Sequence, residues 1–245
     1  MAGRPPIETY VELDSTNAEA RRRAEAGESG PVWILAERQT AGRGRRGRSW
    51  SSGTGNLAAT LLTTTARPPA EAAQVSFLAA LAAADLAETC LGPGAAQLKW
   101  PNDVLVFGRK AVGVLLEAGP RPDGLWLAVG VGVNLASHPT DVEPAATAFA
   151  EHMAARPPEP RAALEILAER FDHWHGLWTA QGFAPIARAW TDRAHGLGRP
   201  CEARLPSQTL RGVAEGLEPD GALRLRLDGG RVERITAGDV FFGGG

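Results

Sequence analysis

The chain has 245 residues and a formal charge of −2, and 44% of its residues are hydrophobic. This composition predicts one large domain, or a large domain with a small companion, and argues against general electrostatic binding to nucleic acid. Cys90 and Cys201 are too few for a disulfide framework or a cysteine-based zinc site, which fits a reducing cytoplasm. We find no signal-peptide pattern and no run of the ~18 apolar residues that a membrane span requires.

Four segments carry helical patterns, at residues 14–27, 70–90, 161–178 and 184–194. In the first segment, Thr16 and Glu19 have the spacing of a capping box, and Gly27 suits the C-terminal end of the helix. The second segment is apolar on most faces, so we expect a buried helix there.

Four runs that are apolar and rich in strand-forming residues predict β-strands, at residues 32–37, 56–62, 96–100 and 125–135. Residues 104–118 predict a hairpin that turns near Gly108. From Gly196 onward, short alternating strands are separated by Pro, Gly and Asp turns, which predicts a small β-barrel. We therefore expect two domains, at residues 1–195 and 196–245.

The most unusual stretch is the loop QTAGRGRRGRSWSSGTGN, in which four arginines alternate with glycines. The arginines are Arg43, Arg45, Arg46 and Arg48. Glycines let backbone N–H groups approach an anion, and guanidinium groups offer forked donors to phosphate. We expect a loop that binds a small phosphate-bearing molecule and stays mobile until the anion arrives. The alternatives are a solvated connector and an RGG-like nucleic-acid patch, which the negative net charge disfavours.

Lys99 and Lys110 are the only lysines, beside 24 arginines. A compact ammonium fits against a single oxygen where a planar guanidinium is too large, so we interpret both lysines as functional rather than as chance surface residues. Between them, Asn102 and Asp103 follow Pro101. This pattern suits either a simple turn or an Mg²⁺ ion, held by Asp103, that bridges nucleotide phosphates.

Other candidate motifs are weaker. The DSTN sequence at the head of the first helix suits an N-cap or, with less support, a binding site at a positive helix end. His173 and His175 lie two residues apart on a predicted helix and face different directions, so a metal site is not expected. No Ser-His-Asp or Cys-His arrangement is evident, which favours a reaction between two bound substrates over a protein nucleophile.

Six motifs occur in an order that resembles the biotin–protein ligases. They are LDSTN (13–17), AERQTAGRGRRGRSW (36–50), KWPNDV (99–104), RKAVGVLLE (109–117), VGVGVNL (129–135) and the terminal pattern RGVAEGLEPDGALRL…ITAGDV. The resemblance implies an α+β fold: a mixed, largely antiparallel sheet with helices, related to class II aminoacyl-tRNA synthetases, followed by an SH3-like barrel.

The same resemblance implies a two-step reaction. The biotin carboxylate attacks the α-phosphate of ATP and releases pyrophosphate, and a lysine of a biotin carboxyl carrier domain then attacks biotinyl-5′-AMP. Joining two anions requires concentrated positive charge and Mg²⁺. Sealing the intermediate from water is a suitable role for a loop that orders over ligand.

Roles are carried over by motif. The residues assigned to biotin are Ser15, Thr16, Asn17, Gln39, Arg43, Gly44, Arg45 and Lys110. Those assigned to ATP are Arg43, Arg45, Arg48, Trp50, Lys99, Asn102, Asp103 and Asn134, with Trp50 and Asn134 near adenine. Lys110, Arg45 and Lys99 are expected to act in catalysis, and Asp103 to hold Mg²⁺.

The chain also departs from the family pattern. LDSTN begins at residue 13, which leaves no room for the N-terminal DNA-binding domain of some members, so no DNA partner is expected. The tail DVFFGGG has no basic residue, so a nucleotide contact from the final strand is not carried over. A homodimer through a central-sheet edge is one option that the sequence does not decide. A lipoate ligase and a non-catalytic nucleic-acid-binding module remain the alternative functions.

We predict that Lys110→Arg slows adenylate formation by about 100-fold, because a displacement of about 1 Å at a reacting group costs that much rate. Biotin-dependent exchange of pyrophosphate into ATP measures this step. An unchanged rate would show that the size of the cation at this position is unimportant.

Overall fold

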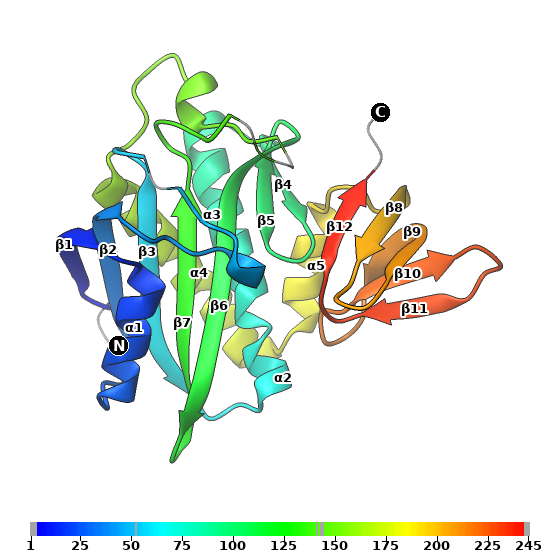
Figure 1. Cartoon of the computed structure of the whole chain (residues 1–245), viewed down its shortest axis with the longest axis horizontal. Coiled ribbons are helices and arrows are strands. Elements are labelled where there is room, and N and C mark those ends of the chain that lie inside the picture. The colour runs from blue at the N-terminus through cyan, green and yellow to red at the C-terminus, as the bar shows by residue number, and fades with distance from the viewer. Residues whose placement is uncertain (1–3, 52, 141, 143–144, 243–245) are drawn as a thin grey trace.

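The computed structural model describes residues 4–51, 53–140, 142 and 145–242, arranged around two β-sheets (Figure 1). The strands of the larger sheet are β1 (Ile7–Leu13), β2 (Val32–Gln39), β3 (Leu57–Thr65), β4 (Ala96–Lys99), β5 (Asp103–Val106), β6 (Arg109–Arg121) and β7 (Gly124–Val133). Their order is β1-β2-β3-β7-β6-β5-β4, with β1 parallel to β2 and all other pairs antiparallel. The predicted mixed sheet is confirmed, as is the β5–β6 hairpin that turns at Gly108.

Helices cover the two faces of this sheet unequally. The helices are α1 (Thr16–Glu25), α2 (Pro69–Ala72), α3 (Val75–Leu91), α4 (Pro160–Gln181) and α5 (Ala184–Asp192), with 3₁₀ turns η1 (Arg45–Gly47) and η2 (Phe149–Glu151). In Figure 1, α1 lies in front of the sheet, and α3 and α4 lie behind it. One face of the sheet therefore builds the main core, and the other carries only α1 and loops.

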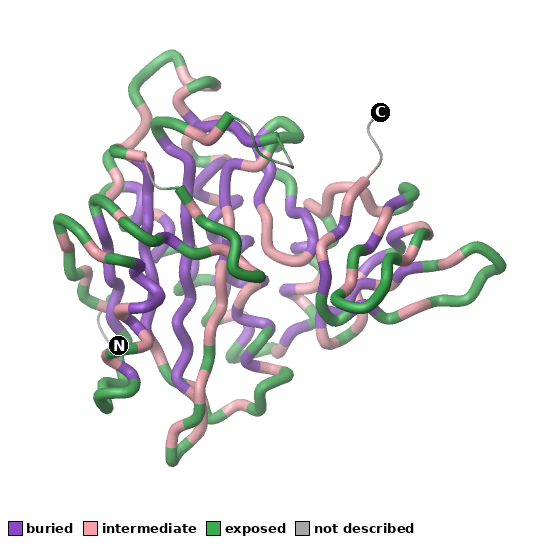
Figure 2. The backbone as a smooth tube through the Cα atoms, in the orientation of Figure 1, coloured by how far each residue is buried: buried purple, intermediate pink, exposed green. Residues whose placement is uncertain are grey.

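The residue alternation of β7 explains this division, because successive side chains on a strand point to opposite faces. Leu127, Val129 and Val131 belong to the main core with α3 and α4, whereas Ala128 belongs to a small core with α1. Figure 2 shows the resulting buried strands at the centre of the larger sheet.

The predicted long helix at 70–90 is broken into α2 and α3. At the break, the Gln74 side chain is buried and accepts a hydrogen bond of 2.8 Å from Trp178 Nε1 of α4. By length and composition only, the segment Pro69–Leu91 could cross a membrane, a test that a buried core helix also passes. Of its most apolar stretch, 67% is buried, because small alanines let α3 pack closely between the sheet and α4.

The N-cap of α1 is Ser15, so the expected capping box from Thr16 to Glu19 is wrong. Ser15 has extended backbone angles, and its hydroxyl accepts a hydrogen bond from the Ala18 N–H. Thr16 is the first helical residue, and its hydroxyl turns toward the Gln39 side chain instead. Gly27 follows the end of the helix with a φ of +98°, as expected of a C-terminal glycine.

The second sheet contains β8 (Pro200–Arg204), β9 (Thr209–Leu217), β10 (Leu223–Leu227), β11 (Val232–Ile235) and β12 (Asp239–Phe242). All pairs are antiparallel, in the order β11-β10-β9-β8-β12. The expected closed barrel is not seen: within the described residues β11 and β12 are the two edges and do not pair. The β10–β11 hairpin projects away from β12, which leaves the sheet open (Figure 1). The domain boundary near residue 195 stays a prediction.

The buried core continues from the larger sheet into the C-terminal sheet. Trp100 Nε1 donates a hydrogen bond of 3.1 Å to the Gly221 carbonyl, and Phe77 packs against the same glycine. Val240 of β12 belongs to the main core cluster. The C-terminal sheet is therefore held against the larger sheet by apolar contacts, which fixes what β12 presents to the rest of the molecule.

We predict that Leu81→Ala lowers the free energy of unfolding by about 2–5 kcal/mol, because the side chain is completely buried in α3 and its removal leaves a cavity. Chemical denaturation measures this change. Thr89→Ala on the exposed side of the same helix is the matched control and should change the free energy by less than about 0.5 kcal/mol. Equal effects would contradict the core role of α3.

Candidate active site

A pocket opens on the α1 face of the larger sheet, between α1, the arginine loop (residues 40–51), β3, β6 and β7. Of the predicted site residues, all but Lys99 line it: Ser15, Thr16, Asn17, Gln39, Arg43, Gly44, Arg45, Arg48, Trp50, Asn102, Asp103, Lys110 and Asn134. Residues from five distant segments of the chain thus meet in one cavity.

Glycines form the floor of this pocket. Gly113 of β6 and Gly132 of β7 are direct cross-strand partners, and the Trp50 ring lies on both. A Cβ added at Gly132 would lie 2.4 Å from this ring, and one added at Gly113 would lie 2.8 Å from it. At Gly130, a Cβ would lie 2.0 Å from Asn17 Oδ1. Any side chain at these three positions would displace the residues that form the pocket walls.

The end of the pocket beside α1 is a hydrogen-bonded polar network. The Gln39 Oε1 atom accepts from the Thr16 backbone N–H at 2.8 Å and from its hydroxyl at 3.1 Å. Asn17 Nδ2 donates to Glu117 Oε2 at 2.8 Å, and Asn17 Oδ1 accepts from the Thr60 hydroxyl at 2.7 Å. These bonds hold the Thr16 and Asn17 side chains in fixed orientations.

Thr60 and Glu117 were not predicted as site residues. Thr60 is completely buried and lies 2.8 Å from the Thr16 hydroxyl, so it supports both polar residues of α1 from below. Glu117 is the last residue of the RKAVGVLLE motif, and its place in that motif is the one sequence signal that could have identified it as a site residue. Thr60 lies in an ordinary strand pattern that gives no such signal.

The opposite wall of the pocket carries Asn134, which is 2% exposed. Its Nδ2 atom donates to the Thr147 carbonyl at 3.1 Å, whereas Oδ1 is buried without a hydrogen-bond partner among the described residues. A buried acceptor without a partner is energetically costly, which indicates a site completed by a donor from a ligand.

The cationic part of the pocket lies between these two walls. Lys110 Nζ is 2.6 Å from Asp103 Oδ1 and 5.7 Å from the centroid of the Trp50 ring. Arg45 Nη1 donates to Asn102 Oδ1 at 3.0 Å. Burial lowers the pKa of Arg45, and the nearby Asp239 and Asp103 carboxylates oppose that effect. An anion that enters here meets both cations.

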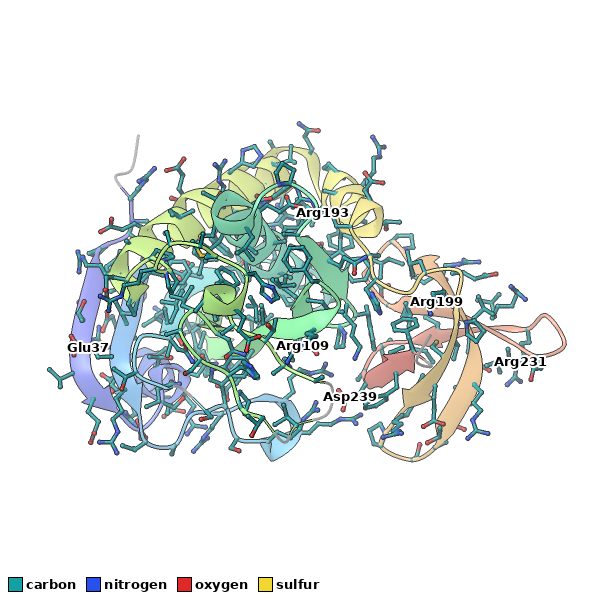
Figure 3. The ribbon with its side chains drawn as sticks, turned by 90° about the horizontal axis from the view of Figure 1, so that it is seen from above. Glu37, Arg109, Arg193, Arg199, Arg231 and Asp239 are labelled. Carbon is teal, nitrogen blue, oxygen red and sulfur yellow. The ribbon has the colours of Figure 1, made fainter. Side chains whose placement is uncertain are left out.

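Asp239 of β12 is a further member of the site that the sequence did not single out. Its carboxylate lies 3.0 Å from Arg48 Nη2, 3.3 Å from Arg46 Nη1 and 3.9 Å from Arg45 Nη1. Figure 3 shows Asp239 on the side of the C-terminal sheet that faces the larger sheet. The ITAGDV motif contains this residue, but only the tertiary structure places it beside a loop about 190 positions earlier in the chain.

Lys99 is the predicted site residue that lies outside the pocket wall. It is the last residue of β4 and is 8% exposed, with its Nζ atom 5.3 Å from the ring centroid of Phe241 in the C-terminal sheet. Burial lowers the pKa of Lys99, and the Asp103 carboxylate partly opposes this shift.

A resident metal ion has little support from the donor set. Within the described part of the chain, no three His, Cys, Asp or Glu side chains are grouped as metal ligands require. Among the described residues of the pocket wall, Asp103 alone offers a carboxylate. One carboxylate fits Mg²⁺ only where nucleotide phosphates supply further oxygens, which is the usual way this ion is held in nucleotide sites.

The fold and the pocket agree with the sequence comparisons. Residues 11–134 match the biotin/lipoate A/B protein ligase family, and residues 196–243 match the biotin protein ligase C-terminal domain. The chain therefore belongs to the biotin/lipoate protein ligase family.

Individual relatives agree over nearly the whole length. The chain is 46% identical to the biotin–[acetyl-CoA-carboxylase] ligase of Paracoccus denitrificans, covering 94% of this chain and 98% of that protein. It is 33% identical to the ligase of the same name from Mycobacterium tuberculosis, covering 96% and 88%. The biotin protein ligase of Aquifex aeolicus, solved with biotin and ATP, superposes with a TM-score of 0.82 at 25% identity, covering 96% and 97%.

We predict that Asp239→Asn loosens the arginine loop, because three guanidinium groups lose their shared counter-charge. Exposed ion pairs contribute only about 0.2–1 kcal/mol each, so trypsin should cleave the loop of the free protein about five-fold faster. Asp228→Asn, at an exposed position in the turn between β10 and β11, is the control and should leave the cleavage rate unchanged. Equal cleavage of wild type and Asp239→Asn would show that Asp239 does not hold the loop.

Proposed function

We propose that this protein is an ATP-dependent ligase that activates biotin as biotinyl-5′-AMP and transfers it to a lysine of a biotin carboxyl carrier domain. The observation that carries the proposal is a single pocket with a fixed hydrogen-bonding end, a cationic middle and a buried unpaired acceptor at the far wall. These parts match the ureido ring, the reacting carboxylate and phosphate, and the adenine of the two substrates.

At the polar end, Thr16, Asn17 and Gln39 are held by hydrogen bonds before any ligand binds. Ser15 lines the same end, and its hydroxyl caps α1. A urea-like ring presents both N–H donors and a carbonyl acceptor, so hydroxyl and amide groups of fixed orientation suit it. Fixed partners reduce the entropy lost on binding.

In the first step, a biotin carboxylate oxygen forms a bond to the α-phosphorus of ATP, and the bond to the bridging oxygen of pyrophosphate breaks. Both reactants are anions, so the step depends on cations that reduce their repulsion. Lys110 and Arg45 serve this role, with Arg43 and Gly44 closing the loop over the substrates. The Asp103–Lys110 ion pair holds the ammonium in position for the phosphate.

In the second step, the amine of the carrier lysine attacks the acyl carbon of the adenylate, and the acyl–phosphate bond breaks to release AMP. Lys110 stabilises the phosphate that leaves. The loop over the pocket limits water, which would otherwise hydrolyse the mixed anhydride.

The nucleotide completes the other wall in this proposal. The Trp50 ring offers a stacking surface for adenine, and the unpaired Asn134 Oδ1 accepts from its exocyclic amine. Arg48, Lys99 and Asn102 contribute to binding of the phosphates. Mg²⁺ would be held by Asp103 and the phosphate oxygens, and it would supply additional charge neutralisation.

The remaining assignments are also proposals. A cytoplasmic location is supported by the two free cysteines, Cys90 and Cys201. A homodimer and an SH3-like class for the open C-terminal sheet follow from the family alone. The nucleic-acid alternative is disfavoured because Arg45, Arg46 and Arg48 share the Asp239 carboxylate as a counter-charge, which reduces the positive charge that the loop offers to a nucleic acid.

The test is biotin-dependent exchange of pyrophosphate into ATP, with lipoate as the parallel substrate. We expect exchange with biotin only and a loss of at least about 100-fold in Lys110→Ala, as for removal of a group that stabilises developing charge. Arg109→Ala, at the neighbouring exposed position, is the matched control and should retain exchange. Exchange with lipoate alone would favour the alternative ligase, and exchange with neither acid would reject both.

A further inference from the structure

The last strand presents two side chains to the larger sheet. Val240 is 1% exposed and packs into the core, so its neighbours Asp239 and Phe241 share the opposite face of β12. Asp239 contacts the arginine loop, and the Phe241 ring contacts Lys99. Two side chains on one face of β12 thus contact both the arginine loop and Lys99, which belong to the proposed nucleotide site.

Lys99 and Lys110 are held in different ways. Lys110 has a carboxylate partner at 2.6 Å, whereas Lys99 forms no salt bridge with any described residue. Its ammonium is instead 5.3 Å from the centroid of the Phe241 ring. The Arg204 guanidinium lies 4.1 Å from the same centroid and helps to fix the ring. The charged groups around Lys99 are Asp103, Asp239, Lys110, Arg48, His195 and Arg204.

An aromatic ring and a carboxylate stabilise a buried ammonium with different consequences. The ring face attracts the cation through its quadrupole and leaves the positive charge unneutralised. A carboxylate would pair with the ammonium and compete with an incoming phosphate. A buried cation with no partner would lose charge to escape desolvation. The ring therefore contacts the Lys99 ammonium without neutralising it, which leaves the ammonium available for an anion.

We propose that Phe241 is a positioning residue for nucleotide binding: its ring holds the Lys99 ammonium in place for the phosphates of ATP. This inference rests on the proposed function. It gives an aromatic side chain of β12 a part in nucleotide binding, although this strand contains no basic residue.

Kinetics of biotin-dependent pyrophosphate exchange test the proposal. In Phe241→Leu, KM for ATP should rise by about 3- to 30-fold, the range that corresponds to loss of one cation–π contact, while KM for biotin stays unchanged.

Two further variants separate positioning from packing. Phe241→Trp keeps an aromatic face and should restore KM for ATP. Phe242→Leu alters the adjacent ring, which packs on Gly196 and His195, and should leave KM for ATP unchanged. An unchanged KM for ATP in Phe241→Leu, or an equal effect of Phe242→Leu, would overturn the proposal.

A measurement without turnover distinguishes failure of this inference from failure of the proposed function. With only two lysines in the chain, protein labelled with ¹³C at lysine Cε gives two side-chain NMR signals, which a Lys110→Arg variant assigns. Phe241→Leu should remove the ring-current shift from the Lys99 signal alone. An unmoved Lys99 signal would overturn the inference even if the wild type exchanges pyrophosphate, whereas absence of exchange in the wild type would reject only the ligase function.

Discussion

Three strand positions without side chains make the pocket. Gly113, Gly130 and Gly132 lie side by side on one face of β6 and β7, and the Asn17 amide and the Trp50 ring occupy the space that their side chains would fill. The other face of the same strands carries the branched residues that pack against α3 and α4. One sheet therefore has a dense core on one side and a recess on the other, and every polar group of the site is positioned relative to that recess.

Charge is distributed around the recess with few counter-ions. Asp239 is shared by three arginines, Asp103 partners Lys110, and Lys99 forms no salt bridge with a described residue but lies near an aromatic ring. The excess of cations is tolerable because burial is partial and each carboxylate serves more than one neighbour. Binding of two anionic substrates would complete this arrangement, which explains why so much positive charge occurs in a chain with a net charge of −2.

The C-terminal sheet contributes side chains to the charged surroundings of the pocket. Apolar contacts of Phe77 with Gly221 and the Trp100 hydrogen bond fix the sheet against the larger one. That attachment lets β12 place a carboxylate and a ring beside loops that are distant in sequence. Assembly of the nucleotide side of the pocket therefore depends on packing between the two sheets, and the arginine loop is restrained by a strand formed at the end of the chain.

The sequence by itself determined the helices, the mixed sheet, the β5–β6 hairpin and most of the pocket lining, because local periodicity and short motifs encode them. The sequence pattern predicts the N-cap of α1 at Thr16, whereas the structure has it at Ser15. Both residues are suitable caps, and only the contact of Thr16 with Gln39 distinguishes them. The tertiary structure alone decided the contacts of Thr60, Glu117, Asp239 and Phe241, the position of Lys99 outside the pocket, and the open C-terminal sheet. These features arise from contacts between segments far apart in the chain, which neither periodicity nor motif spacing records.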